Sequence, residues 1–529
     1  MSIKHVLIAI LVSLLSIHIQ SITVEQQYTT YPYPNDITVY KDLYGAIARK
    51  NILQAPSHLS AINHYIFHGK LDWCKPVKIL IAGGGIGEKT TQLAQQLFDS
   101  RSTTNWKITH LDLSKTSIDL AKKRMILRFG KQLVSQHIKF VHGDLLNVYD
   151  LLPYEEFDYI DCLGVLHTLQ RYVQCEGYPN CYIDKMENVL FIHRFFFFFF
   201  DSFLPLHFIA SFSLYSPSLG LQQLNRMLKP NGGIGIMVYA KMGRHGVYNM
   251  QNMMKMLLQP SDPMPFNINL TKRILNNLPK SNPLRVDPWK WKKLMKTIWN
   301  TTGTNGLVDL FLPAQDVPMS VDDIYQLVTD ANMHLISFVH SSLYKLDSYI
   351  HDRRLQRFLH ERLKTRQEEE MFVERFTGNH YQHFFYVRKK AKVWSWKNEL
   401  DMIPIPLRFD SARLGKALRN STFMPFKNNN LMLYFKLPQS IYNETDAIEC
   451  VLKHIDGKLT IREIRRLSGL RFDDFEIVFD RMYNVLLDQG KLYLSRFPVE
   501  IEKLTTEEME LREVLYPNMP RNGYHCPVC

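Results

Sequence analysis

Short apolar runs alternate with amphipathic stretches through the first two thirds of the chain. Lys78–Ala82 is an apolar run that leads into glycines, and residues 88–98 place Leu93, Ala94 and Leu97 on one helical face. A short apolar run bounded by turn residues is typical of a buried strand, whereas apolar residues three and four positions apart indicate a helix. These residues therefore predict a unit made of a strand, a glycine loop and a helix.

The same alternation continues toward the C-terminus. Ser114 stands where it can cap an amphipathic helix over 114–128. Residues 228–233 form a turn before another apolar run. Further strands are expected at 107–111, 138–142, 157–163, 234–239, 335–340 and 380–387, and a further helix at 321–331. Strands that alternate with helices in this way predict a doubly wound α/β sheet.

The pattern also divides the chain into segments. Residues 241–302 are helical in pattern, rich in methionine and basic, and we expect them to cover the carboxyl edge of the sheet. Beyond residue 389 prolines mark a connection, and three helices with a closing strand then predict a small winged-helix-like α+β domain. The expected segments are 1–21 (signal-like), 22–70 (helical extension), 71–390 (α/β domain), 391–425 (linker), 426–500 (winged-helix-like domain) and 501–529 (tail).

Composition and charge add a candidate partner. The 529 residues are 46% hydrophobic and 22% charged, which is the balance of a globular protein, and the formal net charge is +13. Such an excess favours contact with nucleic acid, anionic lipid or an acidic protein, although the charge is spread along the chain. Basic residues in the C-terminal helices are interleaved with acidic ones, so a nucleic-acid-binding module is the alternative function: Lys453, Lys458, Arg462, Arg465, Arg466 and Arg471.

The two ends of the chain carry localisation and metal signals. Lys4 and His5 precede the apolar run Val6–Ile17, and Ser21 follows, which fits a secretory signal better than a membrane span. This start predicts the secretory pathway or the extracellular space; without a genuine signal the protein would be cytoplasmic. Cys526 and Cys529 provide at most half of a zinc site, so no metal is expected.

Glycines and acids stand at the ends of four successive predicted strands. Asp112 closes the second strand, where a carboxylate can accept both ribose hydroxyls, and Asp144 with the Leu145 amide closes the third, beside an adenine edge. Open α/β sheets bind ligands at the carboxyl ends of their strands. The nucleoside-binding residues predicted from this register are Gly83, Gly85, Gly87, Asp112, Ser114, Asp144, Leu145, Leu163 and Gly164.

At these residues the chain resembles the class I S-adenosylmethionine-dependent methyltransferases. Residues 83–87 match the family's G-x-G-x-G loop, and residues 228–233 its turn before the fifth strand, with Asn231 in place of the first glycine. Val24–Tyr28 and Tyr31–Pro34 are similar to the QY…NPYP opening of a bacterial-type subgroup. In that subgroup the segments at 164–167 and 312–318 also recur. The resemblance implies a Rossmann-like fold, S-adenosylmethionine as cofactor and methyl transfer to an acceptor that the sequence does not identify.

The implied chemistry is in-line attack of a nucleophile on the sulfonium methyl group. His167 is the candidate catalytic base by position, although a helix-capping histidine is equally compatible; Tyr33, Tyr239 and His245 are weaker candidates to line the acceptor pocket. An NAD-dependent oxidoreductase is a third alternative. It fits less well, because Asp112 stands 29 positions after Gly83, whereas a dinucleotide fingerprint expects roughly 20 and a longer glycine motif.

Residues 171–215 interrupt this pattern. Phe195–Phe200 is a run of six phenylalanines inside the predicted sheet, where a membrane-dipping insertion would not pack. Arg171–Val173 can be encoded with a splice donor, Tyr215–Ser216 with a splice acceptor, and phenylalanine repeats are what a polypyrimidine tract translates to. We therefore interpret residues 171–215 as the translation of a retained intron.

Overall fold

A computed structural model of the chain describes nine main stretches and several short pieces. The main stretches are 23–33, 57–99, 105–169, 217–259, 261–286, 303–350, 352–391, 394–407 and 444–497. The short pieces are 172–174, 182–183, 213–215, 291–292, 294–295, 424–425 and 432–433. The signal-like segment 1–21, most of 171–215, and Cys526 and Cys529 lie outside the described residues.

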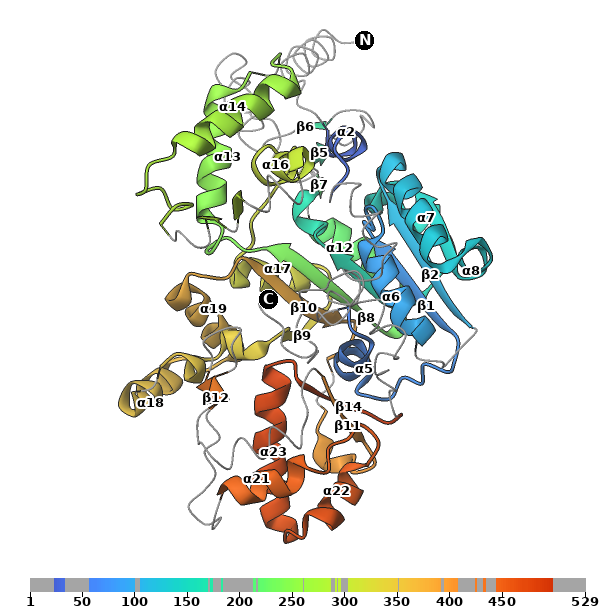
Figure 1. Cartoon of the computed structure of the whole chain (residues 1–529), viewed down its shortest axis with the longest axis vertical. Coiled ribbons are helices and arrows are strands. Elements are labelled where there is room, and N and C mark those ends of the chain that lie inside the picture. Colours follow the sequence, from blue (N-terminus) through green and yellow to red (C-terminus); the bar gives the residue numbers. More distant parts are fainter. Residues whose placement is uncertain are drawn as a thin grey trace, which may run out of the picture.

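A seven-stranded sheet forms the centre of the molecule (Figure 1). Its order is β3-β2-β1-β4-β8-β10-β9. The strands in that order are Ile138–His142, Trp106–Asp112, Val77–Ala82, Phe157–Leu163, Leu228–Tyr239, Gln382–Arg388 and His334–Phe338. β3, β2, β1, β4 and β8 are mutually parallel, and β10 runs antiparallel to both of its neighbours. The predicted doubly wound Rossmann-like sheet is confirmed.

Residue alternation along each strand builds a core on both faces of the sheet. In β1, Ile79 and Ile81 pack into one apolar cluster, and Leu80 and Ala82 into another. Successive side chains of a strand point to opposite faces, so a run that is apolar at every position must be covered on both sides. This is why the strands are apolar runs rather than alternating patterns.

Helices from different parts of the chain cover the two faces. α12 (Pro217–Arg226) and α17 (Val321–Asp330) contribute to the cluster on the Leu80 face, and α5 (Leu59–Phe67), α6 (Glu88–Asp99) and α7 (Lys115–Phe129) to the cluster on the Ile79 face. The predicted helices at 88–98, 114–128 and 321–331 are therefore present, each shifted by one residue at most at its ends.

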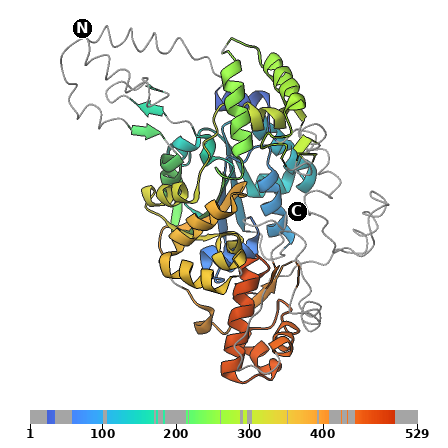
Figure 2. The same cartoon turned by 90° about the vertical axis from the view of Figure 1, so that its left-hand side faces the viewer.

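The segment predicted to cover the sheet is helical where it is described. α13 (His245–Leu257), α14 (Met264–Asn277) and α16 (Gly303–Phe311) share an apolar cluster built on Met250, Leu275 and Leu307. They lie at one end of the molecule, whereas the C-terminal helices lie at the other (Figures 1 and 2).

The C-terminal unit has three helices and a two-stranded sheet. α21 (Glu444–Leu452), α22 (Ile461–Ser468) and α23 (Phe472–Asp488) pack together, and β14 (Leu492–Ser495) pairs antiparallel with β11 (Ile403–Pro406). β11 comes from the stretch predicted as linker 391–425, and Trp396 of the same stretch packs in the core of the unit. The name winged-helix-like for this unit stays a prediction.

His64 on α5 joins the C-terminal unit to the sheet domain. Its Nδ1 accepts a hydrogen bond from the Leu494 amide at 3.3 Å, and its Nε2 lies 3.2 Å from the Tyr483 hydroxyl. Burial lowers the pKa of His64 to about 3, so the ring is neutral and uses one nitrogen as acceptor and one as donor. The two units thus share a buried polar junction.

The remaining described elements are short or peripheral. The helices are α2 (Val24–Thr30), α8 (Lys131–His137), α9 (Val148–Leu151), α18 (Arg353–Arg362) and α19 (Arg366–Thr377). The described 3₁₀ segments are η1 (Leu145–Asn147), η2 (Leu166–Thr168), η4 (Ser341–Tyr344), η5 (Leu346–Ser348) and η6 (Trp396–Asn398). The small strands are β5 (Tyr172–Gln174), β6 (Tyr182–Ile183), β7 (Ser213–Tyr215), β12 (Met424–Pro425) and β13 (Met432–Leu433).

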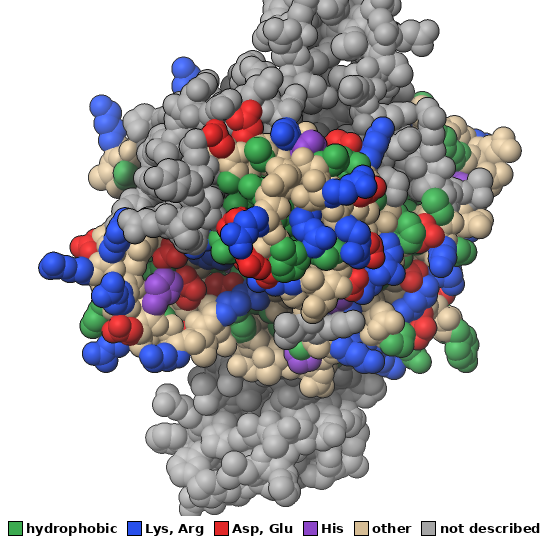
Figure 3. Space-filling model, turned by 90° about the horizontal axis from the view of Figure 1, so that it is seen from below, with side chains coloured by type: hydrophobic (Ala, Val, Ile, Leu, Met, Phe, Trp, Pro, Cys, Tyr) green, Lys and Arg blue, Asp and Glu red, His purple; other side chains and the backbone are tan. Residues whose placement is uncertain are grey.

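Two surface properties bear on the predicted partners. Among the described residues no helix combines the length and apolarity needed to cross a bilayer. On the face seen from below in Figure 3, basic and acidic side chains are interspersed. Arg462 pairs with Asp401 at 3.0 Å, and Arg465 stacks on the Phe472 ring. Nucleic-acid binding by the C-terminal helices stays a prediction.

The two ends of the interrupting segment meet in space. Gly220 on α12 packs so closely on Leu169 that a Cβ atom there would overlap the leucine side chain. Residues on either side of 171–215 are therefore in contact.

We expect a chain lacking residues 171–215 to fold with its sheet intact and to melt at least as high as the full chain. The physical reason is that the cut ends already touch and a shorter loop costs less entropy to close. Thermal unfolding followed by circular dichroism checks this. Loss of cooperative unfolding, or a mature transcript that retains the stretch at full abundance, would contradict the intron interpretation.

Asp161 is a buried carboxyl in the middle of β4. Its Oδ2 accepts a hydrogen bond from the Ser57 hydroxyl at 2.8 Å, and the Tyr159 hydroxyl lies at 3.5 Å, while Oδ1 has no hydrogen-bond partner among the described residues. Burial raises the pKa of Asp161 to about 6, and Lys89, Ser57 and Tyr159 offset part of the rise. Compared with the unfolded chain, the folded protein therefore keeps this carboxyl protonated up to a higher pH.

Because the folded-state pKa exceeds the ordinary value of 3.8, this group contributes full stability below that value and loses it as pH rises toward 6. We expect Asp161→Asn to be more stable than the natural chain by about 1–3 kcal/mol at pH 8, with the difference fading near pH 4. Chemical denaturation at both pH values checks this. A variant that is less stable at pH 8 would refute it.

Candidate functional site

The glycine loop between β1 and α6 has a backbone that only glycine adopts readily. Gly83, Gly85 and Gly87 have φ angles of 71°, 51° and 85°. The amides of Gly83 and Gly84 both donate to the Leu111 carbonyl at 2.9 Å, which ties the loop to the end of β2. A Cβ on Gly83 would overlap the Val165 side chain. The loop is therefore fixed against both neighbouring strands.

Gly85 faces open space rather than packed protein. A Cβ built there would meet only the Tyr33 carbonyl oxygen, at 3.5 Å, within the part of the chain that the structure describes. The loop also leads into the N-terminus of α6, where free amides and the helix dipole favour electron-rich groups. The arrangement leaves room for a ligand against the loop backbone.

Asp112 at the end of β2 is held by the loop itself. Its Oδ2 accepts from the Gly85 amide at 2.7 Å and its Oδ1 from the Ser114 amide at 2.8 Å. Burial raises the pKa of Asp112, and these two amide donors offset part of that rise. Each carboxylate oxygen keeps a second lone pair, so the group can still accept two ligand hydroxyls.

Ser114 is the N-cap of α7, as the sequence predicted. Its Oγ accepts from the Ser117 amide at 3.1 Å and donates to the Tyr28 carbonyl, also at 3.1 Å. Its predicted contact with a cofactor stays a prediction, because these bonds give the hydroxyl a structural role already.

Asp144 and Leu145 lie at the end of β3. Asp144 Oδ1 accepts from the Leu146 amide at 2.9 Å, which caps η1 and leaves Oδ2 directed elsewhere. Burial raises the pKa of Asp144, and the nearby Glu25 carboxyl raises it further. Leu145 is buried. The structure thus places an acid at this edge next to an N-terminal residue.

Leu163 and Gly164 end β4 between the loop and β8. Gly164 has a φ of 83° and its amide donates to the Met237 carbonyl at 3.0 Å. A Cβ on Gly164 would contact only the Met237 methyl group, at 3.5 Å. The register of β1, β2, β3 and β4 therefore brings all the predicted nucleoside-binding residues to one edge of the sheet.

His167 follows on η2 and is almost fully buried. Its ring lies 4.3 Å from the Tyr239 ring at the end of β8, and its Nδ1 has no hydrogen-bond partner among the described residues. Burial lowers the pKa of His167 to about 3, and Arg244 lowers it further. The ring is therefore neutral near pH 7. Its catalytic role stays a prediction, and as a base it would hold a proton only weakly.

Arg244 is a buried cation beside this histidine. Its side chain lies 3.6 Å above the Tyr239 ring, and it is only 9% exposed. Its Nη2 lies 4.0 Å from Asp316, and neither Nε nor Nη2 has a hydrogen-bond partner within the described stretches. A buried guanidinium with unsatisfied N–H groups is costly, and such a group is expected where a ligand binds.

Two carboxyls face Arg244. Asp309 on α16 accepts from the Tyr28 hydroxyl at 2.9 Å, and burial raises the pKa of Asp309 to about 6. Asp316 accepts from Gln251 at 3.2 Å, and burial raises its pKa as well. Two acids therefore accompany one guanidinium.

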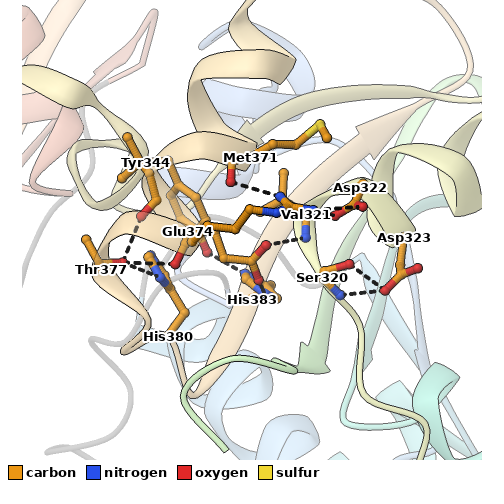
Figure 4. Close-up of polar contacts among 12 residues, drawn as sticks. Ser320, Val321, Asp322, Asp323, Tyr344, Met371, Glu374, Thr377, His380 and His383 are labelled. Carbon is orange, nitrogen blue, oxygen red and sulfur yellow. Dashed lines mark hydrogen bonds and ion pairs between the residues drawn. The ribbon is translucent and has the colours of Figure 1, made fainter. Parts of the chain in front are cut away.

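A buried polar network at the start of α17 holds the loop that carries Asp316 (Figure 4). The Met319 amide donates to the Tyr239 carbonyl at 3.0 Å, and the Val321 amide donates to Glu374 at 2.9 Å. Glu374 also lies 3.1 Å from His383, and both side chains are fully buried. The network fixes the start of α17 and hence the loop before it.

The weaker candidates for the acceptor side are Tyr33, Tyr239 and His245, and they lie in different surroundings. Tyr239 contacts the Arg244 side chain. Tyr33 is close enough to Asp309 and Arg244 for both to affect the pKa of its hydroxyl. His245 begins α13 with an exposed side chain. Asp309 and Arg244 carried no recognised signal in the sequence.

Comparison with known proteins finds similar solved structures at low sequence identity. No family model matches the chain. PKMT2 from Rickettsia typhi in complex with AdoHcy is 14% identical, with 86% of this chain and 76% of that one covered and a TM-score of 0.48. The magnesium protoporphyrin IX methyltransferase ChlM from Synechocystis PCC 6803 with bound SAH is 11% identical (69% and 98% covered, TM-score 0.28), and the [4+2]-cyclase SpnF 13% (71% and 100%, 0.30).

These three TM-scores lie below 0.5, so the site's own residues have to carry the assignment of function. The sheet order, with β10 reversed beside β8, agrees with the Rossmann-like fold predicted from the sequence. A fold of this kind supports several chemistries.

Proposed function

We propose that the protein is an S-adenosylmethionine-dependent methyltransferase. The observation that carries the proposal is the joint placement of Gly85, Asp112, Asp144 and Gly164 at the carboxyl edge of parallel strands. The glycine backbone leaves room for the ligand to approach closely. The Asp112 carboxylate has free lone pairs for the ribose hydroxyls, and Asp144 is an acid that can meet the adenine edge. A dinucleotide site fits less well, for the spacing reason given above.

The cofactor supplies a methyl group that is already activated, so the protein has to bind, align and exclude water. Asp112 would hold the ribose hydroxyls, and Asp144 with the Leu145 amide the adenine edge. Gly83, Gly85 and Gly164 would let the backbone approach the ligand. Tyr239 and His167 would form the apolar wall on the acceptor side.

Binding of the cofactor product is the direct test. We expect the full chain to bind S-adenosylhomocysteine in a calorimetric titration and to show no comparable affinity for NAD. Asp112→Ala should weaken binding by about 1.5–3 kcal/mol, the scale of hydrogen bonds to a charged group.

Asp119→Ala is the matched control, since Asp119 is exposed and pairs only with Lys115 on the surface of α7. Unchanged affinity in Asp112→Ala would reject the ribose role. Absence of binding by both S-adenosylmethionine and S-adenosylhomocysteine would defeat the proposed function.

The charges on the acceptor side favour a basic acceptor. Among the buried groups, Asp309 and Asp316 can together carry two negative charges against the one positive charge of Arg244, whereas Lys255, whose charge also acts on Asp316, is exposed to solvent. A buried group of charges is least costly when it is neutral overall. The site therefore accommodates one further cation better than an anion, and we infer that the acceptor is an amine, which loses a proton before or during attack.

We expect methyl transfer from labelled S-adenosylmethionine to n-butylamine at pH 8 to exceed transfer to butyrate or n-butanol. Asp316→Asn should reduce transfer to the amine by about tenfold, which corresponds to 1.4 kcal/mol, with cofactor kept saturating. Faster transfer to the carboxylate or the alcohol would contradict the amine assignment and leave the methyltransferase proposal untouched.

A further inference from the structure

The N-terminal segment Val24–Tyr33 lies against the nucleoside edge of the sheet. The Tyr28 carbonyl accepts from Ser114, two residues after the ribose-side strand β2, and the Tyr33 carbonyl is the group closest to the open side of Gly85. Glu25 is near enough to Asp144 to raise the pKa of that carboxyl. One short segment therefore approaches all three parts of the predicted nucleoside site.

The other side of the same segment is bonded to the acceptor side of the molecule. The Tyr28 hydroxyl donates to Asp309 at 2.9 Å. Gln27, which is 2% exposed, accepts from the Ala314 amide at 2.5 Å, and Asn305 donates to the Pro32 carbonyl at 2.7 Å. All three partners belong to α16 or to the residues that follow it.

We propose that Val24–Tyr33 forms the outer wall of the nucleoside site, and that the Tyr28–Asp309 hydrogen bond holds this wall in place. The inference rests on the proposed function. Its consequence is that Asp309, a residue of the acceptor side, controls the affinity for the nucleoside without touching it.

The physical basis is coupling through one hydrogen bond to a carboxylate. Tyr28 contacts Ser114 through its backbone and Asp309 through its side chain, so the bond at one end restrains the position of the other. Breaking it removes one of three hydrogen bonds from this segment to α16 and the residues after it, and it loosens a seven-residue helix in which Gln27 is the one buried residue. Such a helix has little intrinsic stability of its own, so the wall would open and the ligand would lose contacts.

Calorimetric titration of the full chain with S-adenosylhomocysteine tests the inference. We expect Tyr28→Phe and Asp309→Ala each to raise the dissociation constant by about 5- to 30-fold, which spans the range from an ordinary hydrogen bond to a hydrogen bond with a charged group. The double variant should be no weaker than the weaker-binding single variant, because both remove the same bond. Tyr154→Phe, whose side chain is 99% exposed, is the control and should bind like the natural chain.

Hydrogen exchange gives a second measurement that does not depend on the variants. Amides of residues 24–33 should exchange more slowly when S-adenosylhomocysteine is bound, and Tyr28→Phe should reduce this protection. If Asp309→Ala unfolds, Tyr28→Phe and the exchange data still decide the question.

The outcomes separate the two proposals. Failure of the natural chain to bind S-adenosylhomocysteine would overturn the proposed function. Binding by the natural chain with unchanged affinity in Tyr28→Phe and Asp309→Ala, additive losses in the double variant, or no added protection at 24–33 would overturn the wall and leave the proposed function standing.

Discussion

The close approach of neighbouring side chains to the backbone of the glycine loop is the constraint on which the rest of the site depends. Gly83 leaves no space for a side chain against Val165, and Gly84 leaves none against His110. The loop can therefore sit on the ends of β1, β2 and β4 at once, and its Gly85 amide reaches Asp112. Asp112 is thus oriented by the same loop that leaves open space at Gly85, so the side chain proposed to bind the ribose is already held in place.

Most of the fold, and the places of the residues proposed for the nucleoside half of the site, could be predicted because they depend on local sequence. A strand that is buried on both faces has to be an apolar run, and a turn at its carboxyl end has to bring its polar residue to the sheet edge. The acceptor half could not be predicted in the same way. Arg244 and Asp309 are 65 positions apart in the sequence, and only the packing of α13 on α16 brings them to Tyr239. Tyr28 and Asp316 lie in segments that resemble the methyltransferase subgroup, but the sequence predicted no role for either residue.

The C-terminal unit shows a related limit. Its helices were visible from their periodicity, but its partner strand β11 lies in a stretch of prolines that reads as a linker. Proline is compatible with an edge strand, since such a strand leaves half of its backbone groups unpaired. What identifies β11 is its pairing with β14, which lies 86 residues further on, counted from Pro406 to Leu492. Pairing over that distance leaves no mark in either segment.

The junction at His64 has a consequence for how the molecule moves. Tyr493 and Ile403, from the C-terminal unit, are part of the same apolar cluster as Ile79 and Trp106 in the central sheet. A module that swings on a hinge needs a polar, separable interface, and this one is apolar with a buried neutral imidazole at its centre. The two units therefore behave mechanically as one body. The C-terminal helices support α5 in a fixed position. Any signal that they receive would have to be transmitted as strain in the sheet rather than as a change in domain angle.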